Sequence, residues 1–218
     1  MKKTFLSILC ALCVVNLSFA KEKDEADSLA KNQVKYRDIS YSMTSLELAD
    51  GTQLSSTYGA AISVGKTFRL HKKPILGLLS FGIDATWVDL NYANYEVECQ
   101  YYDGKVSSNN IMQAEYSMHI GPSVTLLPNK KISVNAYLRY APTFSAVYVN
   151  ESIYSGYVSN IVSGACVTFK SFGIGIEQRI GNCTYSVLGD SEDVEESLFS
   201  LDGTTSLSNM RAYITFRF

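Results

Sequence analysis

The chain has 218 residues, with 19 Lys and Arg against 21 Asp and Glu, so its formal net charge is −2. This length fits a single barrel or sandwich domain, and the charge balance argues against a nucleic-acid-binding protein. Three cysteines follow residue 20, an odd and widely spaced set that indicates neither a disulfide framework nor a zinc site.

The first twenty residues have the pattern of a cleaved secretory signal. Two lysines precede an apolar stretch from Phe5 to Phe19, and Ser18 and Ala20 put small residues at positions −3 and −1 of a cleavage site. We predict that residues 1–20 are removed on export; a retained anchor helix is the alternative. Residues 21–35 are highly charged and are predicted to be flexible. No later apolar run is long enough for a transmembrane helix.

From residue 36 onward, apolar and polar side chains alternate, which predicts β-strands with one apolar and one polar face. Eight strands are expected, at 36–46, 57–70, 75–92, 111–127, 131–148, 159–169, 172–186 and 207–218. In the fourth of these, Met112, Tyr116 and Ile120 share one face and Glu115 and His119 share the other. Lys66 interrupts the apolar side of the second strand.

The connections between these strands alternate in length. Short turns are expected at 71–74, 128–130 and 170–171, and long connections at 49–56, 93–110, 149–158 and 187–206. Antiparallel strands joined in this way would place all short turns at one end. The chain would start and finish at that same end.

Alternation does not say which face points inward, and a soluble lipocalin-like barrel would turn its apolar face in. An outward apolar face is favoured by strands of about 14–18 residues, which cross a bilayer at about 3.3 Å per residue even when tilted. The polar face carries charges of both signs. Aromatic residues gather near strand ends, as in interfacial girdles: Tyr58, Phe68, Phe81, Trp87, Phe144, Tyr148, Phe169, Phe172, Phe216 and Phe218.

The last nine residues, 210–218, alternate strictly and finish on an aromatic side chain. This strand resembles the C-terminal signal by which outer-membrane barrels are recognised for insertion, with Tyr213, Phe216 and Phe218 as its signal residues. Nearly the whole mature chain resembles the small eight-stranded outer-membrane barrels of the OmpA/OmpX type, the outer membrane protein beta-barrel domain group. The resemblance implies an all-β fold over 36–218, an eight-stranded antiparallel up-and-down transmembrane β-barrel, with 21–35 on the periplasmic side.

The same resemblance implies a location in the outer membrane of a Gram-negative cell and a set of partners. These are outer-membrane lipids and lipopolysaccharide, the barrel-assembly machinery during insertion, and a surface partner bound through the Tyr-rich 93–110 and acidic 187–206 loops. We expect a monomer and no nucleic-acid partner.

The interior of an eight-stranded barrel is just wide enough to be filled by side chains. Charged residues are predicted to face it at Asp84, Glu115, His119, Arg139, Glu177, Arg179 and Arg211. We expect them to pair with one another, because isolated buried charges are costly; a narrow ion path is the alternative. His119 shares its face with Ser117 and Ser123, but no motif pairs a nucleophile with a base, so we predict no enzyme and no catalytic, cofactor or metal residues.

The predicted function is therefore structural, or a contact at the cell surface made through the extracellular loops. Two alternatives stay open at this point. One is a small porin-like or gated channel, and the other is a soluble lipocalin-like carrier of an apolar ligand.

Overall fold

The computed structural model describes residues 33–48, 51–71, 73–100, 106–129, 131–149, 152–187 and 204–218. They form one antiparallel sheet: β1 (Gln33–Glu47), β2 (Gln53–Ser55), β3 (Tyr58–Arg69), β4 (Leu79–Gln100), β5 (Val106–Leu126), β6 (Ile132–Val149), β7 (Ser152–Phe169), β8 (Phe172–Val187) and β9 (Thr204–Arg217). None of these residues forms a helix long and apolar enough to cross a membrane. The predicted signal peptide, 1–20, lies outside the described residues, as does 21–32 of the charged segment.

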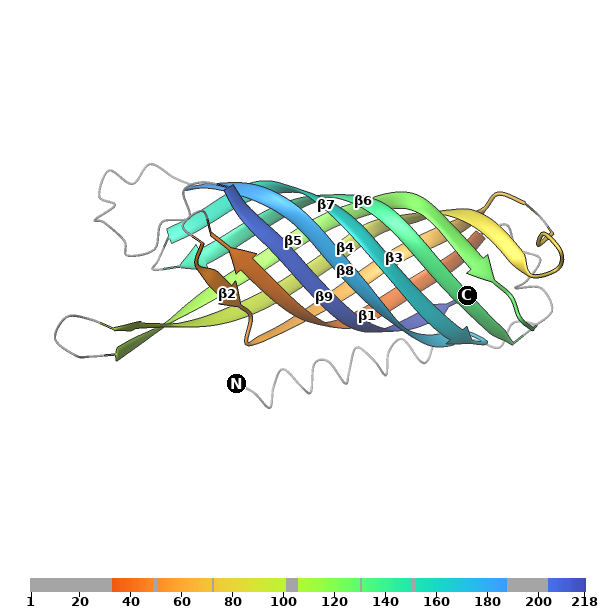
Figure 1. Cartoon of the computed structure of the whole chain (residues 1–218), viewed down its shortest axis with the longest axis horizontal. Helices are drawn as coiled ribbons and strands as arrows, with labels where there is room; N and C mark the ends of the chain where they lie inside the picture. Colours follow the sequence, from red (N-terminus) through yellow and green to blue (C-terminus); the bar gives the residue numbers. More distant parts are fainter. Residues whose placement is uncertain are drawn as a thin grey trace. The chain divides into compact units, whose positions relative to one another are not determined.

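The sheet closes on itself (Figure 1). Each strand from β3 onward pairs with the next in sequence, and β1 pairs with both β3 and β9. The short strand β2 pairs with the last residues of β1, so eight strands make up the wall. At the closing seam, Lys35 and Phe218 exchange backbone hydrogen bonds of 2.9 and 3.0 Å. Closure removes the free edge over the length where all eight strands pair, and the end of the β4–β5 hairpin extends beyond its neighbours.

Both chain ends of the barrel lie with the connections 70–78, 127–131 and 170–171, which we name the turn end (Figure 1). The opposite end, with the connections after β1, β4, β6 and β8, is the loop end. The connections predicted to be short therefore share one end of the barrel and those predicted to be long share the other, as expected. Residues 33–35, predicted to belong to the flexible segment, instead begin β1.

All four predicted long connections contain strand residues: β2 lies within 49–56, β9 begins at Thr204 within 187–206, and the other two differ more. The segment 93–110 is mostly strand, because β4 continues to Gln100 and β5 begins at Val106. Likewise β7 begins at Ser152 and not at 159. The sequence in these segments is polar and rich in turn-forming residues, but residues 94–100 pair with 106–112 across the β4–β5 hairpin, and 152–158 pair with β6. This pairing overrides local propensity. Residues 101–105 and 188–203 lie outside the described residues.

A β-bulge in β4 interrupts the alternation. The register of β4 against both neighbours shifts at Thr86–Asp89, where Trp87 and Val88 are both exposed on the outer face. The extra residue flips the pattern, so Asp89 faces the interior although the alternation before it would have turned it outward.

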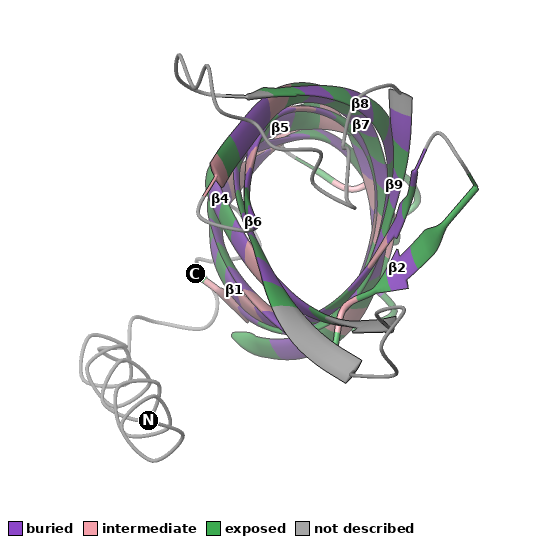
Figure 2. Ribbon diagram, turned by 90° about the vertical axis from the view of Figure 1, so that its left-hand side faces the viewer, coloured by how far each residue is buried: buried purple, intermediate pink, exposed green. Residues whose placement is uncertain are grey.

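The apolar face points outward, as predicted. Buried and exposed residues alternate along the strands (Figure 2). Large apolar side chains on the outer face are 43–63% exposed, among them Ile62, Leu90, Met118, Ile120, Leu138, Ile161, Ile174, Ile176, Ile180 and Ile214. An apolar band around a barrel with a polar interior is the arrangement of a transmembrane barrel. The predicted fold class, an eight-stranded antiparallel transmembrane β-barrel, is confirmed.

Aromatic residues flank this band. The phenylalanines on the outer face near the turn end are Phe68, Phe81, Phe169, Phe172, Phe216 and Phe218. Toward the loop end the exposed aromatic residues are mainly tyrosines: Tyr41, Tyr58, Tyr116, Tyr148 and Tyr157. Tyrosine suits a boundary where the ring contacts lipid and the hydroxyl reaches water.

Four interior tyrosines fit because each faces a glycine on a neighbouring strand. Tyr36 lies opposite Gly65, and Tyr137 lies opposite Gly164. Tyr213 and Tyr185 are placed in the same way, opposite Gly175 and Gly156. A Cβ atom on Gly65, Gly164 or Gly175 would overlap the facing tyrosine. These glycines therefore provide the space that a narrow barrel lacks.

Candidate functional site

The most distinctive interior feature is a group of charged side chains about halfway along the barrel. All seven residues predicted to face the lumen are buried, and the structure adds Asp89, which forms ion pairs with two of them; Asp38 of β1 is buried as well. We name the seven residues and Asp89 the lumen charge cluster: Asp84, Asp89, Glu115, His119, Arg139, Glu177, Arg179 and Arg211. It draws on β4, β5, β6, β8 and β9, so most of the wall contributes to it.

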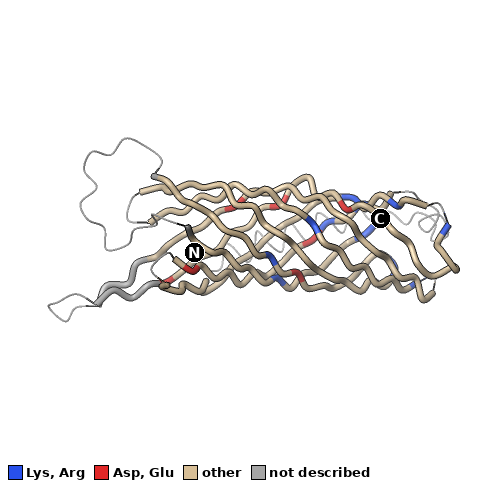
Figure 3. Tube along the Cα trace, turned by 45° about the horizontal axis from the view of Figure 1, so that its top comes forward, with Lys and Arg blue, Asp and Glu red and all other residues tan. Residues whose placement is uncertain are grey.

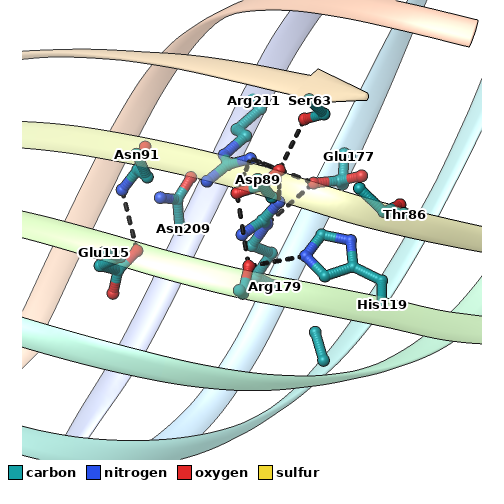
Figure 4. Close-up of polar contacts among 12 residues, drawn as sticks. Ser63, Thr86, Asp89, Asn91, Glu115, His119, Glu177, Arg179, Asn209 and Arg211 are labelled. Carbon is teal, nitrogen blue, oxygen red and sulfur yellow. Dashed lines mark hydrogen bonds and ion pairs between the residues drawn. The ribbon is translucent and has the colours of Figure 1, made fainter. Parts of the chain in front are cut away.

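Asp89 is the centre of the cluster (Figure 4). Its Oδ2 lies 2.7 Å from Nη2 of Arg179 and 2.9 Å from Nη1 of Arg211. Ser63 Oγ donates a third hydrogen bond to the same oxygen at 2.6 Å. In the closed sheet β4 and β8 have three strands between them on either side. The Arg179–Asp89 ion pair therefore joins opposite walls across the lumen.

Glu177 is the second acceptor of the cluster. Its Oε1 accepts a hydrogen bond from Arg179 Nε at 2.8 Å and lies 3.7 Å from Arg211 Nη1. Tyr137 donates its hydroxyl to Oε2 at 2.8 Å. Arg179 is thus held by two carboxylates at once. A guanidinium with several donors in fixed geometry suits this kind of bridging.

Arg139 extends the cluster toward the turn end. Its Nη2 lies 2.8 Å from Asp84 Oδ2, and its Cζ lies 3.5 Å from the centroid of the Tyr137 ring. Arg139 Nη1 is 3.8 Å from Glu177 Oε2, which links this pair to the rest of the cluster. Cation–π contact with a ring adds to the stabilisation of a buried guanidinium.

The structure does not bring the remaining two residues into the ion pairs. Glu115 accepts hydrogen bonds from Asn91 Nδ2 at 2.9 Å and from Gln113 Nε2 at 3.1 Å. His119 Nε2 lies 2.8 Å from Ser117 Oγ, while His119 Nδ1 has no hydrogen-bond partner. Both residues are held by neutral groups of the lumen.

The Ser117–His119 contact does not form a nucleophilic triad. In a triad, the carboxylate binds the ring nitrogen that does not face the nucleophile and so fixes the tautomer. Here Asp89 Oδ1 lies 3.4 Å from the serine hydroxyl instead, and the other ring nitrogen is unpaired. All three side chains are buried. Among the described residues, no group of His, Cys, Asp and Glu could hold a metal ion.

Toward the loop end, the polar interior gives way to an apolar one. A layer of neutral amides comes first, in which Gln113 accepts from the Tyr95 hydroxyl and donates to Ser145 at 3.0 Å. Beyond it lies a hydrophobic cluster that we name the apolar cap: Leu46, Leu48, Leu54, Ala93, Tyr95, Ile111, Val147, Val149, Tyr154, Val158, Cys183, Tyr185 and Leu207. The cap was not predicted from the sequence.

At the loop end, the outer face of the wall changes from apolar to polar. Polar side chains are exposed there at Glu47, Glu96, Asn110, Asn182, Thr184, Ser186, Ser206 and Ser208. A wall that is apolar inside and polar outside is the arrangement of a water-soluble barrel. The loop-end part of the wall is therefore built for an aqueous exterior.

The predicted C-terminal signal residues lie in two environments. Tyr213 is buried in the lumen, and Phe218 is 48% exposed on the outer face. Phe216 also lies on the outer side, and its ring meets Phe172 edge-on with the centroids 5.6 Å apart. Their part in barrel assembly stays a prediction.

No family model and no curated protein sequence matches the chain. Among solved structures it is similar to Ail, the attachment invasion locus protein of Yersinia pestis, with 9% identity, a TM-score of 0.40 and coverage of 86% of this chain and 100% of that one. It is similar to Neisserial surface protein A (12%, 0.47, 84% and 97%) and to the outer membrane protease OmpT of Escherichia coli (8%, 0.45, 87% and 97%).

Identities and TM-scores this low add nothing to what the barrel's own geometry shows. The closed eight-strand wall and its outward apolar band confirm the resemblance to small outer-membrane barrels at the level of architecture. A shared architecture does not show that this chain has the functions of these structural neighbours.

Proposed function

We propose that this chain is an integral outer-membrane protein with a closed lumen, which acts by contact at its loop end. The outward apolar band supports membrane insertion, and the polar outer face beyond it supports a part of the wall that projects into water. The predicted partners, lipopolysaccharide and a surface ligand, belong to this projecting part.

The observation that carries the proposal is that two groups of buried side chains follow one another along the lumen, and we infer that together they close it. An ion pair joins opposite walls at Asp89 and Arg179, and the buried residues of the apolar cap lie beyond it toward the loop end. Ions would have to separate buried ion pairs and then cross an apolar layer, and both steps are costly. A barrel closed in this way serves as an anchor and a platform.

The first test is conductance. The folded barrel, verified by a heat-dependent shift in gel mobility, is reconstituted into planar bilayers, and single-channel currents are recorded at both polarities. We expect no steps above those of protein-free bilayers. Reproducible steps that change in Asp89→Asn but not in Trp87→Phe, a lipid-facing control, would overturn the closed-lumen proposal. Steps unchanged by Asp89→Asn come from a contaminating pore and leave the barrel closed.

The second test concerns the loop end. Binding of the full chain to lipopolysaccharide-containing bilayers is compared with that of a variant in which 189–202 is replaced by a Gly-Ser linker. We expect weaker binding of the variant with an unchanged heat shift, because the acidic loop would act through divalent cations. Equal binding by both proteins, with and without EDTA, would argue against this loop as the contact.

A gated channel is the second candidate, and one observation favours it. Several buried polar atoms in the turn-end half of the lumen have no hydrogen-bond partner among the described residues, including Ser123 Oγ and Arg217 Nε. Such atoms normally bind water, so the turn-end half of the lumen is suited to hydration. Opening would then require displacement of the apolar cap and separation of the Asp89 ion pairs.

A further inference from the structure

Basic residues of the barrel gather toward the turn end (Figure 3). All lysines in the described part of the chain lie in that half: Lys35, Lys66, Lys73, Lys131 and Lys170. The last three belong to turns. Lys35 and Lys66 differ from them, because they lie within the barrel wall and face outward. Lys66 is the residue that interrupts an otherwise apolar strand face.

Lys35 of β1 and Lys66 of β3 are direct cross-strand partners. Residues in this relation on one face have Cβ atoms about 4.5–5.5 Å apart, and like charges directly opposite destabilise a sheet. Neither lysine forms an ion pair with an acidic side chain of the residues that the structure describes. The pair therefore has no acidic side chain as a partner within the described barrel.

A third cation lies on the same face. Arg37 follows Lys35 by two residues and is also exposed, with its Cζ 5.5 Å from the centroid of the Phe218 ring. We name Lys35, Arg37 and Lys66 the basic outer patch. Along β3, Lys66 has Val64 before it and Phe68 after it on the same face. The patch thus lies within the apolar band, close to the edge of the band at the turn end.

The depth of the patch fits a lipid headgroup. Arg37 is the cross-strand partner of Phe216, and Lys35 is hydrogen-bonded through its backbone to Phe218, so the patch lies level with the turn-end phenylalanines. Long basic side chains at this depth lay their methylene stems along apolar surface and extend their charges to the interface. Phosphate groups are the anions found there.

We propose that the basic outer patch binds the phosphate of an anionic phospholipid in the leaflet at the turn end. The inference rests on the proposed membrane insertion, because only an inserted barrel presents this face to lipid. Three cations on one small area match a headgroup with net negative charge and favour it over a zwitterionic one. The bound phosphate also removes the repulsion between the two opposed lysines.

The test is native mass spectrometry of the full chain in detergent, titrated with phosphatidylglycerol or phosphatidylcholine. The wild type is expected to retain phosphatidylglycerol in preference to phosphatidylcholine. The double variant Lys35→Gln/Lys66→Gln is expected to lose about thirty-fold in phosphatidylglycerol affinity, as two interfacial basic residues would contribute. The control Lys73→Gln/Lys131→Gln removes the same charge from turns at the same end and should retain the lipid.

The possible outcomes test lipid binding by the patch, its specificity for lipid, and membrane insertion separately. Equal retention of both lipids by the wild type, or undiminished retention by the Lys35→Gln/Lys66→Gln variant, would overturn the patch as a lipid site. Displacement of the lipid by millimolar inorganic phosphate would show an anion site without lipid specificity, and would also overturn it. A heat-dependent gel shift checks that each variant is folded. A protein that stays soluble without detergent would instead overturn the proposed membrane insertion itself.

Discussion

Replacement of Asp89 is the sharpest test of the lumen charge cluster. The Asp89→Ala change leaves Arg179 with only Glu177, and leaves Arg211 with only the same carboxylate at 3.7 Å. Removing one partner of a buried ion pair typically costs about 3–5 kcal/mol, because the remaining charge is buried without compensation. We expect a loss of this size in the free energy of unfolding.

The assay uses a probe already in the chain. Trp87 is the only tryptophan, lies two residues before Asp89 and is 45% exposed on the outer face, so its fluorescence reports release from lipid during urea titration of the vesicle-inserted barrel. The control Ser63→Ala removes one hydrogen bond to the same carboxylate and should cost about 1–2 kcal/mol.

A double variant separates charge from packing. In Asp89→Ala/Arg211→Met the cation left without its partner is removed as well, so the loss should be clearly smaller than the sum of the single losses. The reasoning is refuted if Asp89→Ala costs no more than Ser63→Ala, or if the two single effects simply add.

Two further predictions concern packing and assembly. Gly164→Val should lower the temperature at which the heat-dependent gel shift is lost, because its side chain would overlap the Tyr137 ring and hydroxyl; combining it with Tyr137→Ala should restore part of the loss, and no restoration would contradict the packing argument. Phe218→Ala should lower the fraction of barrel inserted in cells but hardly change its urea midpoint in vesicles, since Phe218 is half exposed; a normal inserted fraction would count against the C-terminal signal.

The strands and their faces could be predicted from the sequence in the part of the wall where the outer face is apolar toward lipid and the inner face is polar toward the lumen. In β5, the exposed Met112, Tyr116 and Ile120 alternate with the buried Glu115 and His119, as the pattern indicates. The period of two is decisive here because a slip of one residue would turn every side chain to the wrong environment.

The inward orientation of Asp89 could not be predicted from the alternation, because the bulge at Trp87 and Val88 shifts the alternation by one residue directly before it. Trp87 and Val88 are consecutive large apolar residues inside a strand, and this doublet is the only local sign of the extra residue. The bulge carries the most connected carboxylate of the cluster into the lumen. A bulge that re-aims a single side chain is a recurrent feature next to functional sites.

The ends of β4, β5 and β7 were missed for a different reason. Beyond the apolar band the outer face no longer needs to be apolar, so the outward positions are held by polar residues such as Glu96 and Asn110, within the segment that was predicted to be a loop. At the same level the inner face turns apolar, with Tyr95 and Ile111 in the cap. The alternation continues there, but the apolar side chains lie on the inner face and the polar ones on the outer face. A sequence interpretation that assumes one constant pattern therefore predicts a loop.

This reversal bears on the choice between the apolar-out and lipocalin-like alternatives. The membrane-spanning part has its apolar face outward, and the projecting part has it inward, because each wall segment places its apolar side away from water. The level at which the pattern reverses is therefore the level at which the outer environment changes from lipid to water. The apolar cap follows from the same argument, since a projecting wall without lipid around it needs a core of its own. In the proposed function, that core closes the lumen and holds the loop-end strands in place as a contact surface.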